Sequence, residues 1–123
     1  MEKGISSTKE ILLLSPQSLL NWLTCQFWVS DIPEGIHSID DMRLANTINL
    51  QLASYESYLN MLSLQIELLS RDAKRNKSKT EQEDMIDRKK IIQGMADIIK
   101  HQREALSRSV TIYTKILEEE KNI

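Results

Sequence analysis

The chain is poor in residues that form turns or cross-links, because its 123 residues include only three Gly, two Pro and one Cys. It also has a single Phe. Three Gly, two Pro and a single Phe argue against a turn-rich β fold, in which short strands are separated by turns about every 8–12 residues. The single cysteine, Cys25, cannot build a disulfide framework within one chain, which fits a reducing compartment. It lies in an apolar segment with no activating base beside it, so we interpret it as an inert core thiol. We expect an all-α protein located in the cytoplasm.

Long apolar runs are also missing. No stretch approaches the roughly 18 apolar residues that a membrane-spanning helix requires, so we expect no membrane span. The apolar run over 11–14 is interrupted at once by Ser15-Pro16, and no small-residue cleavage site follows, so we expect no secretory signal. The formal net charge is only −2. However, residues 1–70 carry three basic and eight acidic side chains, whereas 71–123 carry thirteen basic and ten acidic. This asymmetry suggests that the two ends of the molecule meet different neighbours.

The middle of the chain combines low charge with a regular apolar pattern. From Leu44 to Ser70 the only charged residues are Glu56 and Glu67. The apolar residues there follow steps of three and four, which place them on one face of an α-helix, as in a coiled coil. These residues are Ala45, Ile48, Leu52, Tyr55, Leu59, Leu62, Ile66, Leu69 and Ala73. A second apolar set lies roughly opposite, where a surface helix would normally carry charges: Leu50, Met61, Leu64 and Leu68. We infer that this helix is covered on two sides.

Capping signals divide the chain into three main helices within a single domain, 1–123. Ser15-Pro16 begins a helix over 16–30, and Ser38 caps a second helix over 38–75. A basic bend at about 75–79 follows. Thr80 and Glu83 form a capping box that begins a third helix over 80–121. Residues 1–14 are expected to be a tail with one short helical turn. The third helix has doubled apolar positions, as expected for a helix with two neighbours: Ile91/Ile92, Ile98/Ile99, Ala105/Leu106, Ile112/Tyr113 and Ile116/Leu117.

These elements predict a long antiparallel helical hairpin with the shorter N-terminal helix packed on its open end, forming a three-helix bundle or coiled coil that oligomerises. A helix over 16–30 is about 22 Å long, so after a short loop it would cover the second helix only as far as Tyr55. Met61, Leu64 and Leu68 would then form an exposed apolar patch, which soluble monomers usually avoid. We expect self-association or docking on a partner through this patch. The alternative is a kinked third helix that wraps over these residues in a monomer.

Two other clusters are candidate contact sites. Trp22, Phe27 and Trp28 are either anchors for a protein interface or part of the core between the N-terminal helix and the hairpin. A membrane-surface role is less favoured, because no Lys or Arg lies between Lys9 and Arg43 to meet anionic lipid. The bend carries a basic cluster of Arg71, Lys74, Arg75, Lys77 and Lys79. This cluster fits a solvated bend, a contact to nucleic-acid phosphates, or a contact to an acidic protein.

Residues for chemistry are scarce. His101 has Asp97 and Glu104 at helical spacing, as in di-metal helical bundles, but the second helix offers no histidine to complete such a site. We therefore interpret the trio as solvated surface. No phosphate-binding loop or nucleophile motif is present in the sequence, so we expect no catalytic residue, metal or cofactor and no enzymatic activity. The sequence favours a structural or adaptor subunit that works by protein–protein packing, as a homo-oligomer or within a larger complex. The alternative is a nucleic-acid-associated protein that uses the basic bend.

Overall fold

The computed structural model describes residues 8–27, 32, 35–76 and 78–121, excepting the side chains of residue 8 and of 72–76. Within these ranges the chain forms four α-helices and no strand. They are α1 (Thr8–Leu12), α2 (Pro16–Phe27), α3 (Ile39–Asn76) and α4 (Lys79–Lys121). At 1.5 Å per residue, the 38 residues of α3 and the 43 of α4 extend roughly 57 and 65 Å. The prediction of an all-α fold dominated by two long helices is confirmed for the described residues.

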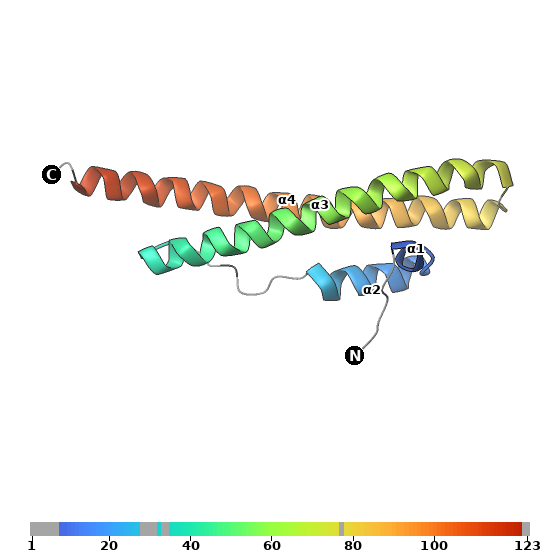
Figure 1. The fold of residues 1–123 in the computed structure, drawn as a ribbon, viewed down its shortest axis with the longest axis horizontal. Helices are drawn as coiled ribbons and strands as arrows, with labels where there is room; N and C mark the ends of the chain where they lie inside the picture. Colours follow the sequence, from blue (N-terminus) through green and yellow to red (C-terminus); the bar gives the residue numbers. More distant parts are fainter. Residues whose placement is uncertain (1–7, 28–31, 33–34, 77, 122–123) are drawn as a thin grey trace.

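The two long helices lie side by side for most of their length (Figure 1). Side-chain contacts between them give the direction of the pairing. Asn49 Nδ2 donates to Ser107 Oγ at 2.9 Å, and Glu67 pairs with Lys89. Residue numbers therefore rise along α3 as they fall along α4, so the two helices are antiparallel.

The core between the two helices follows the pattern predicted for α3. Six predicted positions are buried: Ala45, Ile48, Leu52, Leu59, Leu62 and Ile66. Tyr55 and Leu69 are partly buried and pack against the same core, and the Ala73 side chain lies outside the described part of the chain. On α4 the buried residues recur every seven positions: Met85, Ile92, Ile99 and Leu106. Such a repeat keeps one face of each helix turned toward its partner over many turns.

The N-terminal helices lie on the half of the hairpin nearest the link between α3 and α4 (Figure 1). Arg88 Nε of α4 donates to the backbone oxygen of Leu14 at 2.7 Å, just before α2 begins. At the other end of α2, the ring of Phe27 lies 5.6 Å from that of Tyr58. The prediction that this helix packs on the open end is therefore wrong. The prediction assumed that the chain folds back tightly after the helix, whereas the connection over 28–38 is long enough to separate the end of α2 from the start of α3.

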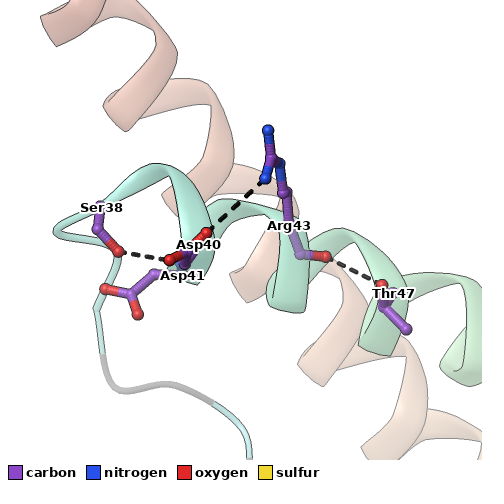
Figure 2. Close-up of polar contacts among 5 residues, drawn as sticks. All are labelled: Ser38, Asp40, Asp41, Arg43 and Thr47. Atoms are coloured by element: carbon purple, nitrogen blue, oxygen red, sulfur yellow. Dashed lines mark hydrogen bonds and ion pairs between the residues drawn. The ribbon is translucent and has the colours of Figure 1, made fainter.

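Serine caps define the start of both long helices. At α3, Ser38 Oγ accepts from the Asp41 N–H at 3.1 Å (Figure 2). Asp41 Oδ2 accepts from the His37 N–H at 3.0 Å. The Ser38 hydroxyl thereby satisfies one backbone donor that the first turn leaves open, and the Asp41 carboxylate holds the backbone of the residue before the cap. Asp40 in the same turn forms an exposed ion pair with Arg43 at 3.8 Å. Ser38 is the cap that the sequence predicts.

The cap of α4 differs from the prediction. The helix begins at Lys79, and Ser78 Oγ accepts from the Glu81 N–H at 3.2 Å. Ser78-Lys79-Thr80-Glu81 and Thr80-Glu81-Gln82-Glu83 both have the form of a capping box, and only one can hold the first turn. The cap predicted from the sequence, Thr80, is therefore two residues too late, and the predicted start of the helix at residue 80 is one residue too late.

The doubled apolar positions of α4 are divided between core and surface. Ile92 and Ile99 are buried, whereas Ile98 and Ile112 are more than half exposed. Ile91 lies beside Leu20 of α2, so among the described helices α2 is a second neighbour of α4 along part of its length. The doubled positions were expected to mark a helix with two neighbours, and in the described part of the chain this holds where α2 lies against α4.

Candidate protein-interaction surface on α3

The two carboxylates in the middle of α3 point toward α4. Glu56 pairs with Arg103, and Glu67 pairs with Lys89, across the interface between the long helices. The Glu56 side chain is only 18% exposed, because Arg103 and α4 cover it. Since these two are the only charged residues between Leu44 and Ser70, the opposite side of this segment carries no charge.

That uncharged side presents a row of residues that we call the outer stripe. Its six members follow steps of four and three along the helix: Leu50, Ser54, Ser57, Met61, Leu64 and Leu68. Leu50 is 76% exposed, Leu64 70% and Leu68 59%. Both serines are exposed, whereas Met61 is partly buried and packs against the core. The stripe therefore presents three leucines to solvent without a nearby charge.

The exposure of Leu64 and Leu68 was expected, whereas Met61, expected in the same exposed patch, is partly buried. The structural reason for the exposure also differs from the one inferred. These residues lie in the same half of the hairpin as α2, so α2 is not too short to reach them. Instead, α2 packs mainly against α4, and its Phe27 contacts Tyr55 and Tyr58 on another side of α3. Within the described residues, no helix wraps over Leu64 and Leu68, as a kinked α4 would. Leu50, together with the two serines, extends the stripe beyond the predicted patch, and the 4-3 spacing is the signal that joins them.

The structure describes two residues of the aromatic cluster, Phe27 and Trp22, and both pack against the core. Phe27 is 8% exposed, and its ring centroid lies 4.8 Å from that of Tyr55 and 6.1 Å from that of Trp22. Both pairs have the edge-to-face geometry that aromatic rings favour. Trp22 is partly buried against the same core, and Trp28 lies outside the described residues. Of the two interpretations of this cluster, core packing describes Phe27, which has almost no surface left for a partner.

The basic bend is described only in part. Arg71 and Lys79 are exposed on either side of the link, whereas the side chains of Lys74, Arg75 and Lys77 lie outside the described residues. Two basic residues farther along α4 are engaged within the molecule. Arg88 donates to the backbone of Leu14, and Lys89 pairs with Glu67.

Two residues with potential chemistry, His101 and Cys25, are placed on the surface. The Nδ1–H of His101 donates to the backbone oxygen of Asp97 at 2.7 Å. Cys25 is an exposed free thiol, so its assignment to the core is wrong. The buried face of α2 follows Leu19, Leu23 and Phe27, and Cys25 falls between these positions on the opposite side. Among the described residues, no three His, Cys, Asp or Glu side chains gather closely enough to hold a metal ion.

None of the helices in the described part of the chain combines the length and apolar character needed to cross a membrane. Comparisons of this chain with models of protein families, with curated proteins and with solved structures find no match.

Proposed function

We propose that this chain is a non-enzymatic structural or adaptor subunit that works by packing the outer stripe of α3 against another protein in a larger assembly. The observation that carries the proposal is the pairing of Glu56 and Glu67 with α4, which leaves the exposed leucines on a face without charge. A single exposed leucine is ordinary on a protein surface. A row of them without neighbouring charges is typical of a surface that binds a partner.

The energy available from such packing is sufficient for a specific but reversible contact. Fully burying a leucine side chain contributes about 2 kcal/mol. The three leucines of the outer stripe start about two-thirds exposed, so covering them contributes roughly 4 kcal/mol from this chain. The partner surface contributes a similar amount, and the loss of free motion on association opposes both. We therefore expect a complex that forms and separates within the cell.

Photo-crosslinking tests this proposal. A photoreactive amino acid replaces Leu64 in the cells that make the protein, and a matched variant carries it at Gln93, an exposed position on α4. We expect discrete adducts of defined mass from position 64 that are missing from position 93. The proposal is wrong if position 64 yields no adduct, or the same adducts as position 93.

The alternative function is contact with nucleic-acid phosphates through the basic bend. The exposure of Arg71 and Lys79 at the end of a long hairpin favours it. The internal contacts of Arg88 and Lys89 weigh against it, because these side chains are already engaged. Binding of a labelled oligonucleotide that weakens steeply with salt and is lost in Arg71→Glu/Lys79→Glu would support this function. Absence of binding at low salt would eliminate it.

A further inference from the structure

We infer that the partner of the outer stripe is a second copy of this chain. The two α3 helices would lie antiparallel about a two-fold axis that crosses the stripe at the level of residue 59 along the helix. This inference rests on the proposed function and names the partner for the same surface. It also makes the interface self-complementary, as a two-fold dimer requires.

The spacing of the stripe is the same in both directions. Its steps are four, three, four, three and four, so a copy rotated by a two-fold axis presents the same spacing in reverse. In this register every member faces another member of the stripe. The resulting pairs are Leu50 with Leu68, Ser54 with Leu64, and Ser57 with Met61, and the midpoint of each pair is residue 59.

The sizes of the paired residues favour the antiparallel arrangement. Each antiparallel pair contains at least one large apolar side chain, and two of the three place it against a serine. A parallel pair of helices would instead set Ser54 against Ser54 and Ser57 against Ser57, which leaves gaps between the large residues. Protein interfaces are close-packed like interiors, and such gaps lose attractive contacts.

Electrostatics permits the two copies to approach. Identical charges on identical faces would repel, but Glu56 and Glu67 are turned toward α4 and paired there. The residues that flank the stripe on α3 are neutral as well, including Asn46, Ala53 and Asn60. A face without charge suits a second copy of itself better than a strongly acidic or basic partner.

The size of the contact fits a reversible dimer. From Leu50 to Leu68 the stripe is about 27 Å long. Two helices that touch along this length, with axes about 8–10 Å apart, bury less than the roughly 1,600 Å² of a standard interface. We therefore expect a dimer in the micromolar range of concentration.

Disulfide formation tests the register. In a Cys25→Ser background, Ser54→Cys and Leu64→Cys proteins are oxidised separately and as a mixture. The antiparallel register places these two positions level with each other, whereas each position lies about 15 Å along the axis from its own copy. A disulfide needs Cα atoms within about 7 Å, so we expect linked dimers from the mixture and almost none from either protein alone. Linkage of each protein to itself, or equal linkage in a Gln93→Cys control, would overturn the register.

Sedimentation of the full chain tests the dimer itself. Leu64→Glu is expected to weaken dimerisation at least about 30-fold, as for a residue at the centre of an interface. Ile98→Glu is the matched control, because Ile98 is an exposed apolar residue of α4 outside the stripe. A wild-type monomer at about 100 µM, or equal weakening by both variants, would overturn the inference. If the wild type is monomeric but position 64 still cross-links to another protein in cells, the dimer fails while the proposed function stands.

Discussion

Two leucines separated by one residue on α3 should respond very differently to the same substitution. Leu62 is fully buried between the long helices, whereas Leu64 is 70% exposed in the outer stripe. Leu→Ala in a well-packed core costs about 2.7–5.0 kcal/mol, depending on how far the surroundings collapse into the space. In a slender hairpin the facing helix can move toward the cavity, so we expect about 3 kcal/mol for Leu62→Ala. This is a large fraction of a typical stability of about 5–15 kcal/mol.

For Leu64→Ala the same reasoning gives a much smaller effect. Only about a third of the side chain is covered in the monomer, so the lost burial is worth roughly 0.6 kcal/mol. Alanine is also the best helix former, which offsets part of that loss. Urea denaturation followed by circular dichroism, at about 1 µM to limit self-association, measures both variants against the wild type. Equal losses of stability, or a larger loss for Leu64→Ala, would refute the assignment of the two faces.

Three further outcomes are expected. Ser78→Ala should lower the free energy of unfolding by about 1 kcal/mol, because it removes the cap of α4. Thr80→Ala should change the free energy of unfolding by less than about 0.5 kcal/mol. A larger loss for Thr80→Ala than for Ser78→Ala would show that Thr80 is the cap. Arg103→Met should lower the stability of the fold by roughly 1–2 kcal/mol, because it leaves the mostly buried carboxylate of Glu56 unpaired. Lys89→Met should lower it by less than about 1 kcal/mol, because its pair with Glu67 is more exposed. Thermal unfolding at matched ionic strength compares the two variants, and equal losses would contradict the difference in burial. Cys25 should react fully with a thiol reagent in the folded protein, and protection until denaturant is added would show that it is buried.

The surface on α3 was predictable from the sequence only in part. The position of Leu64 and Leu68 on the side of α3 opposite the core followed from the helical period. Their exposure was inferred from the short reach of the N-terminal helix, which is not the reason that the structure gives. Leu50 was already placed in the second apolar set, but the membership of Ser54 and Ser57 was not recognised, since serine carries no hydrophobic signal. Ser54 and Ser57 matter because they are small and lie beside large apolar residues in the stripe. This becomes apparent only once the face is known to be exposed.

The period of the apolar residues determined by itself that α3 and α4 are long helices, and it identified the residues of α3 that face the core. Steps of three and four are a local property, because the 3.6-residue turn brings such positions to one side whatever lies beyond. Only the tertiary structure decided where α2 packs, that Phe27 is internal and that Glu56 and Glu67 turn toward α4. An extended connection over 28–38 reaches up to roughly 37 Å, so chain length permits α2 to lie on either half of the hairpin. The choice between the halves depends on contacts between residues far apart in the sequence, such as Arg88 with the backbone of Leu14, and no local pattern records them.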